Sequence, residues 1–168
     1  MKGKTGLYGE LVLCRVLGHT MSPMNMPYCP YRHKVHYYET DQMSVVHHSN
    51  YIRWFEEART DLLEQMGISY ARMEELGIII PVLAVACEFK QSVKYGDTVR
   101  VIPVTETFTG LRMSLSYRIL DDISGELRAF GTSRHCFLDR NFKPLALKRL
   151  HPEVYDLFTQ LVGRDMEA

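Results

Sequence analysis

A single apolar stripe on a predicted helix over residues 50–66 constrains this chain most. The stripe has helical spacing and consists of Tyr51, Trp54, Phe55, Ala58, Leu62 and Met66. Ser49 or Asn50 can serve as the N-cap of this helix, and Gly67 suits a left-handed cap at its end. The aromatic breadth of the stripe predicts that the helix packs lengthwise on the face of a sheet.

The rest of the chain predicts an α+β domain around that helix. Strands are expected over residues 31–40, 81–93, 98–108, 111–120 and 127–138, and further helices over 69–77 and 151–163. Short turns join the last four strands, which favours antiparallel pairing. We therefore expect one five-stranded antiparallel sheet wrapped around one long helix. On that helix, Glu56 and Arg59 lie opposite the stripe and predict a solvent-side ion pair.

Length and charge limit the classes of protein to consider. At 168 residues the chain fits one domain, and its 20 basic residues equal its 20 acidic ones. This balance gives no basic field for nucleic acid, and no apolar run approaches the roughly 20 residues that a membrane-spanning helix needs. We expect a soluble globular protein that binds no nucleic acid and inserts into no membrane.

Residues 1–30 stand apart from the predicted domain, which we place at residues 31–168. Three prolines and three methionines fall between positions 21 and 31, a composition typical of an extended connector, so we expect an arm or an added strand. The four cysteines form no CxxC pair and are Cys14, Cys29, Cys87 and Cys136. We interpret them as reduced thiols of a cytoplasmic protein, two of them within strands.

Asp41 lies in a turn-like run about eight residues ahead of the predicted helix cap. The residues alone leave two roles open, an Asx-turn or a reacting carboxylate. A helix N-terminus offers free N–H groups that can hold an oxyanion, and Asp41 can attack an acyl carbon there or activate a water. The chain has no GxSxG, GxGxxG or GxxxxGK[ST] motif that would point to other chemistry.

The nearby histidines do not predict a metal site. They are His33, His36, His47 and His48. Their spacing matches no recognisable ligand pattern, so no metal is expected. We interpret His48, which is next to the helix start, as the histidine of the site and His47 as its neighbour.

These residues resemble the hotdog-fold acyl-CoA thioesterases. The segments "YYETD", "SVVHHSNY" and "RWFEEAR" are similar to the pattern of the branch that contains 4-hydroxybenzoyl-CoA thioesterase and the Tol–Pal-linked short-chain acyl-CoA thioesterases. A second, weaker match is "EFKQSVKYGDTVRV", and the resemblance extends over residues 31–155. It implies hydrolysis of acyl-CoA to free acid and CoA, without a cofactor. It also implies a homodimer or homotetramer with the site at a subunit interface.

The resemblance implies roles for individual residues. Asp41 matches the catalytic aspartate, as nucleophile or general base, and Tyr37 matches an assisting aromatic position. His48 matches the start of the central helix, where a backbone N–H polarises the thioester carbonyl. The phosphates of CoA require basic groups at the rim of the site. The expected substrate-binding residues are Ser49, Asn50, Tyr51, Lys90 and Arg112.

One residue departs from the family pattern. The family has glycine three residues after the aspartate, and this chain has Ser44 there. If the turn requires a positive φ, serine strains it.

Two alternatives to an acyl-CoA hydrolase stay open. An acyl-carrier-protein thioesterase would use the same chemistry on a different thiol carrier. A non-catalytic module on the same fold would bind acyl-CoA without releasing thiol, although Asp41 and His48 in the motif speak against it.

Overall fold

The computed structural model describes residues 28–165. Its strands are β1 (Tyr31–Lys34), β2 (Val82–Phe89), β3 (Thr98–Phe108), β4 (Arg112–Asp121) and β5 (Leu127–Cys136). Its helices are the short 3-10 helix η2 (Tyr37–Glu39), α2 (Ser49–Gln65), α3 (Tyr70–Glu75), α4 (Leu147–Leu150) and α5 (Pro152–Leu161). The sequence predicted all of these elements except η2 and α4.

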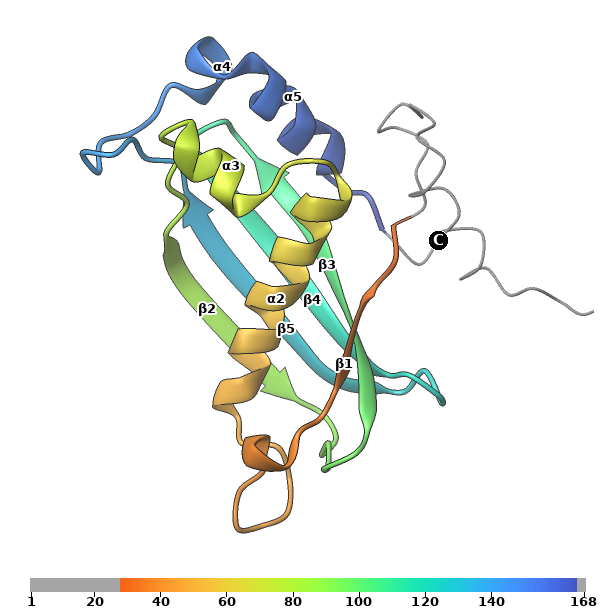
Figure 1. The fold of residues 1–168 in the computed structure, drawn as a ribbon. Coiled ribbons are helices and arrows are strands. Elements are labelled where there is room, and N and C mark those ends of the chain that lie inside the picture. Colours follow the sequence, from red (N-terminus) through yellow and green to blue (C-terminus); the bar gives the residue numbers. More distant parts are fainter. Residues whose placement is uncertain (1–27, 166–168) are drawn as a thin grey trace, which may run out of the picture.

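The five strands form one antiparallel sheet with the order β1-β3-β4-β5-β2. The long helix α2 lies across one face of this sheet, and α3, α4 and α5 gather beyond one end of it (Figure 1). The segment between η2 and α2 and the loop from β2 to β3 lie at the other end. The predicted fold class is therefore confirmed.

The core forms where the apolar stripe of α2 meets the sheet. Trp54, Phe55, Ala58 and Leu62 are almost fully buried, as the helical spacing predicted. Phe55 stacks on Tyr117 of β4 at 4.3 Å between ring centroids. A Cβ on Gly131 of β5 would lie 2.2 Å from the Phe55 ring, so only glycine allows this close approach of helix and sheet.

The first strand is shorter than the sequence predicted. Residues 31–40 were expected as one strand, but β1 ends at Lys34 and η2 follows. A capping box explains the change, because the Glu39 carboxylate accepts a hydrogen bond from the His36 backbone N–H at 2.7 Å. The turn directs Glu39 into the interior, and only 4% of its surface remains exposed.

The start of α2 also differs from the prediction. Neither Ser49 nor Asn50 caps the helix, because both lie inside it and His48 occupies the N-cap position. The end of the helix agrees with the sequence, since Gly67 has φ +87°. Ser69 then caps α3 by accepting from the Arg72 backbone N–H.

A buried polar layer lies between α2 and the sheet. The predicted solvent-side pair of Glu56 and Arg59 is wrong, because Arg59 is buried and its Nε donates to the Tyr70 hydroxyl at 2.9 Å. Ser133 Oγ lies 2.7 Å from Nε2 of the fully buried His135. Burial, together with the Arg59 cation, lowers the pKa of His135 to about 4.

Only the last three residues of the predicted N-terminal extension are described. There the Cys29 backbone exchanges two hydrogen bonds with the Gln65 side chain of α2, at 3.0 and 2.9 Å. The placement of residues 1–27 as an arm or strand lies outside the described residues and stays a prediction.

Ser44, which stands where the family that the sequence resembles has glycine, adopts a left-handed backbone conformation. Its φ is 60°, in the left-handed region, and its side chain is exposed. An L-residue with a Cβ is less stable there than glycine. The missing glycine therefore costs folding free energy in this turn.

We expect acidification to destabilise the fold through His135. The unfolded imidazole binds a proton near pH 6.5, whereas the folded one binds it only near pH 4. Unfolding therefore takes up a proton between these values, and the free energy of unfolding falls as pH falls through this window, by up to about 3 kcal/mol. Denaturant titrations at pH 7, 6, 5 and 4 measure the slope.

His135→Gln should flatten that slope between pH 6.5 and 4, and His48→Gln, which removes an exposed imidazole, should leave it unchanged. A His135→Gln protein that folds and keeps the full slope contradicts this account. Glu39 overlaps this window only at its acid end, because its folded pKa is lowered from 4.5 and its contribution is lost as pH falls below that value. The measurements at pH 7, 6 and 5 therefore separate the two groups.

Ser44→Gly should stabilise the protein by about 0.5–1 kcal/mol, because it removes the strain of a positive φ at a residue with a Cβ. Thermal and denaturant unfolding measure the gain. Ser92→Gly is the matched control, since Ser92 is also exposed but does not have a positive φ. Equal effects of the two substitutions would contradict the strain at Ser44.

Candidate active site

Asp41 forms the turn that the sequence allowed. Its Oδ1 accepts a hydrogen bond from the Met43 backbone N–H at 2.8 Å, which makes an Asx-turn. The Asp41 N–H bonds to the Val45 carbonyl, and the Ser44 N–H bonds to the Asp41 carbonyl. The second carboxylate oxygen accepts no hydrogen bond from the described residues, and the side chain is half-buried. The turn thus holds one oxygen of Asp41 and leaves the other open for chemistry.

Glu39, two residues earlier, is the buried centre of this end of the molecule. Its Oε1 accepts from Trp54 Nε1 at 2.8 Å, and its Oε2 lies 2.8 Å from His33 Nε2. Burial opposes ionisation, but hydrogen bonds from His33, His36 and Trp54 lower the pKa of Glu39 below its usual value. The sequence analysis missed Glu39; its only local signal was an acid three residues after His36.

The start of α2 faces the same region and carries the predicted His48. The backbone N–H of His48 has no acceptor among the described residues. His47 Nδ1 accepts from the Ser49 N–H at 3.3 Å and lies 2.8 Å from Ser49 Oγ. The His47 and His48 rings are 4.0 Å apart. The His47 ring thus accepts from the first N–H of α2, and the N–H of the N-cap residue His48 stays open to a ligand.

Asn50 and Tyr51, both predicted to bind substrate, point into the protein. The Asn50 amide donates to the Glu39 carbonyl at 2.8 Å. Tyr51 packs between the rings of Trp54 and Phe89, each 4.9 Å away. Burial raises the pKa of Tyr51 to about 12, so its hydroxyl remains protonated at neutral pH.

Tyr37 lies on η2, close to Asp41 in sequence, but its side chain is exposed. The residue is 78% exposed and its ring meets Tyr95 edge-on at 5.6 Å. Tyr95 belongs to the turn of the second sequence motif, where Gly96 has φ +86°. Within the chain, Tyr37 therefore borders the site from the solvent side.

The two sequence motifs meet in space through one backbone bond. The Val46 N–H donates to the Val93 carbonyl at 2.8 Å, which joins the Asp41 segment to the loop between β2 and β3. Lys90 begins this loop, and its Nζ donates to Glu88 at 2.8 Å. Lys90 thus lies at the same end of the sheet as the Asp41 turn.

Arg112 is separated from this group. It begins β4, where Met113 pairs with Phe108 at the far end of β3. The loop that contacts the Asp41 segment leads instead into Thr98, at the near end of β3. Figure 1 shows the start of β4 next to the terminal helices, at the opposite end from the η2–α2 segment. One chain therefore does not bring Arg112 to Asp41.

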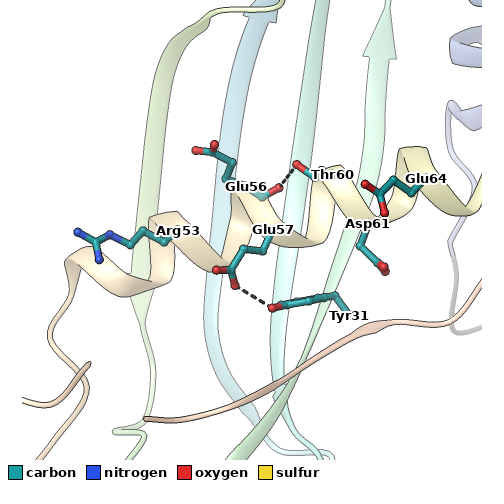
Figure 2. A pocket seen from close by; sticks show the side chains of 7 residues that line it. All are labelled: Tyr31, Arg53, Glu56, Glu57, Thr60, Asp61 and Glu64. Atoms are coloured by element: carbon teal, nitrogen blue, oxygen red, sulfur yellow. Dashed lines mark hydrogen bonds between the residues drawn. The ribbon is translucent and has the colours of Figure 1, made fainter. Parts of the chain in front are cut away.

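A groove runs along the solvent side of α2, where Figure 2 shows its lining. The groove contains none of the predicted site residues, and its lining consists of Tyr31, Arg53, Glu56, Glu57, Thr60, Asp61 and Glu64. Within it, the Tyr31 hydroxyl donates to Glu57 at 2.9 Å. Four carboxylates line the groove, which makes it unsuited to the phosphates of CoA.

Other kinds of site find little support in the described part of the chain. Among residues 28–165, no group of three or more histidine, cysteine or acidic residues is arranged to hold a metal. Cys29, Cys87 and Cys136 are free thiols, and Cys14 is outside the described residues. Across the same residues, no helix is long and apolar enough to cross a membrane.

The geometry has the parts that acyl transfer requires. The turn that contains the Asp41 carboxylate is tied by hydrogen bonds to the start of the 17-residue helix α2, and the N–H of its N-cap residue has no acceptor within residues 28–165. A carboxylate can attack a carbonyl or activate a water, and a helix N-terminus stabilises the oxyanion that follows.

Comparison with known proteins agrees with the fold and points to thioesterases. A model of the thioesterase-like superfamily matches residues 35–158. "Putative acyl-CoA thioesterase YneP" of Bacillus subtilis is 36% identical over 71% of this chain and 87% of its own. A 1,4-dihydroxy-2-naphthoyl-CoA hydrolase of Thermosynechococcus vestitus is 27% identical over 67% of this chain and 77% of its own.

Solved structures agree as well. The crystal structure of a DHNA-CoA thioesterase from Staphylococcus aureus superposes with a TM-score of 0.74 and 35% identity, covering 80% of this chain and 91% of that one. A protein from Thermus thermophilus superposes with a TM-score of 0.73 and 31% identity, covering 81% and 98%. The matched residues include both the Asp41 turn and α2. The chain belongs to the thioesterase-like superfamily, whose fold is the hotdog fold.

Proposed function

We propose that this protein hydrolyses acyl-CoA thioesters to a free acid and CoA, with Asp41 as the reacting carboxylate. The observation that carries the proposal is the tie between the Asp41 turn and the start of α2. The carbonyl of Glu39, two residues before Asp41, accepts from both the His47 N–H and the Asn50 side chain, each at 2.8 Å. These two hydrogen bonds therefore tie the segment that contains the carboxylate to the start of the helix.

The His48 backbone N–H is the proposed oxyanion donor. It has no acceptor within residues 28–165, and it lies at the N-cap of α2, where the helix dipole favours negative charge. A thioester carbonyl oxygen placed against this N–H gains stabilisation as it becomes an oxyanion. Ser49 and Tyr37 border this position, and Lys90 is the basic residue proposed to meet a CoA phosphate.

Two routes balance the reaction with these groups. As a nucleophile, Asp41 attacks the acyl carbon and expels CoA thiolate, which takes up a proton; water then cleaves the resulting anhydride and regenerates the carboxylate. As a general base, Asp41 accepts a proton from a water that attacks the acyl carbon, and the departing CoA thiolate takes up a proton. Both routes use the same oxyanion position.

We also propose that two chains associate through β2, completing the site. β2 is an edge strand of the sheet. Its residues on the side facing α2 include Val82, Val85 and Phe89, which are 51%, 38% and 51% exposed. An exposed apolar edge strand favours pairing with another strand. Phe89 contacts Tyr51 at the start of α2, so such an interface would adjoin the proposed site.

Asp41→Asn should lower kcat for thiol release by about 100-fold or more, because the amide neither attacks nor accepts a proton. The fold should persist, since an asparagine oxygen can accept the same bond from the Met43 N–H. Thiol release from short, long and aromatic acyl-CoAs, followed with a thiol reagent, measures the effect.

Asp139→Asn is the matched control, because Asp139 makes the same kind of turn by accepting from the Asn141 N–H at 2.8 Å. It should keep wild-type activity. Full activity of Asp41→Asn would refute the role of Asp41.

Faster hydrolysis of the same acyl group on a carrier protein would identify that carrier as the substrate. Tight acyl-CoA binding without thiol release would identify a binding module.

Val85→Asp should dissociate the assembly and lower activity, because it places a carboxylate in the proposed β2 interface. Sedimentation or light scattering measures the mass, with the wild type expected as a dimer or tetramer. Ile123→Asp is the control, since Ile123 is 98% exposed in the β4–β5 turn and should change neither quantity. A monomeric, fully active wild type would contradict the shared site.

A further inference from the structure

We propose that Glu39 is the positioning residue of the active site, and that its ionised carboxylate holds Asp41 in register with the start of α2. This inference rests on the proposed hydrolysis at Asp41. Glu39 contacts no substrate in this account, and it acts only through the elements that it joins.

The side chain of Glu39 is anchored on three elements. Trp54 Nε1, from the apolar face of α2, donates to Oε1 at 2.8 Å. The His36 N–H, at the start of η2, donates to Oε2 at 2.7 Å. His33 Nε2, from β1, lies 2.8 Å from Oε2 and 3.1 Å from Oε1. The carboxylate therefore has three donors, from α2, from the start of η2 and from β1, and the two oxygens share the Nε2–H of His33.

The backbone of Glu39 extends this anchor to the reacting groups. Its carbonyl accepts from the His47 N–H and from the Asn50 amide, which fixes the approach to α2. Thr40 then forms an isolated bridge with Val46, and the Asp41 turn closes between them. A shift of the Glu39 side chain would thus be transmitted to Asp41 within two residues.

An ionised carboxylate suits these contacts and an amide does not. Both Glu39 oxygens face N–H groups, and a carboxylate can accept on both. A glutamine can accept on one only and would turn its NH2 group against either Trp54 or His36. The donors also lower the pKa of Glu39, in agreement with an ionised side chain. Glu39→Gln therefore keeps nearly the same side-chain shape but cannot accept from all of these N–H groups.

The experiment compares Glu39→Gln, Trp54→Phe and the double variant with the wild type, by steady-state hydrolysis of an aromatic acyl-CoA. Glu39→Gln should lower kcat by about 10- to 100-fold with KM within about twofold, because a displaced carboxylate loses its alignment with the bound carbonyl. Trp54→Phe should lower kcat less. Circular dichroism at the assay temperature verifies that each variant is folded.

The double variant separates positioning from general damage. Trp54→Phe removes the indole N–H, so the glutamine side chain introduced by Glu39→Gln can accept from the His36 N–H without turning its NH2 group toward the N–H of Trp54. The loss in kcat should then be smaller than the product of the two single losses. Glu57→Gln is the matched control, because Glu57 Oε2 is 3.7 Å from His33 Nδ1 but forms no hydrogen bond or ion pair with the Asp41 segment among the described residues. It should keep the wild-type kcat.

Three results would overturn the inference: a folded Glu39→Gln protein with wild-type kcat, a change in KM alone, or a double variant whose loss equals the product. If Glu39→Gln does not fold, Trp54→Phe decides, and an unchanged kcat there overturns the inference. Failure of the proposed function looks different, since the wild type itself would then release no thiol.

Discussion

The hydrogen bond from Trp54 to Glu39 joins the core of this protein to its candidate active site. Trp54 lies in the apolar stripe that packs α2 on the sheet, and its indole N–H points out of that stripe to a buried carboxylate. The contacts that bury α2 therefore also fix η2 and the Asp41 turn. A buried carboxylate is costly unless every oxygen is bonded, and here each oxygen has two partners.

The same molecule contains a second buried polar group with the opposite protonation behaviour. Glu39 is surrounded by donors that favour its ionised form, whereas burial and the nearby Arg59 cation keep His135 neutral near pH 7. Glu39 is bonded to Trp54 in the first half of α2, whereas His135 lies near Arg59, farther along the helix. The helix is thus held by hydrophobic burial along its length and by specific polar contacts that fix its position on the sheet.

Much of this arrangement could be predicted from local patterns. The helical spacing from Tyr51 to Met66 predicted α2, and the family pattern pointed to the turn in which Ser44 has a positive φ. The role of Asp41 in that turn stays a prediction. Glu39 and Arg59 could not be identified in this way, because burial of a charged side chain depends on partners distant in sequence. Their partners Trp54 and Tyr70 are 15 and 11 residues away.

A structure with a ketone analogue of an aromatic acyl-CoA, in which CH2 replaces the thioester sulfur, tests the central claim most directly. The account predicts the carbonyl oxygen about 3 Å from the His48 backbone N and an Asp41 oxygen roughly 3–3.5 Å from the carbonyl carbon. An analogue bound in the acidic groove along α2, or at the Arg112 end of the sheet with its carbonyl far from His48, would contradict it.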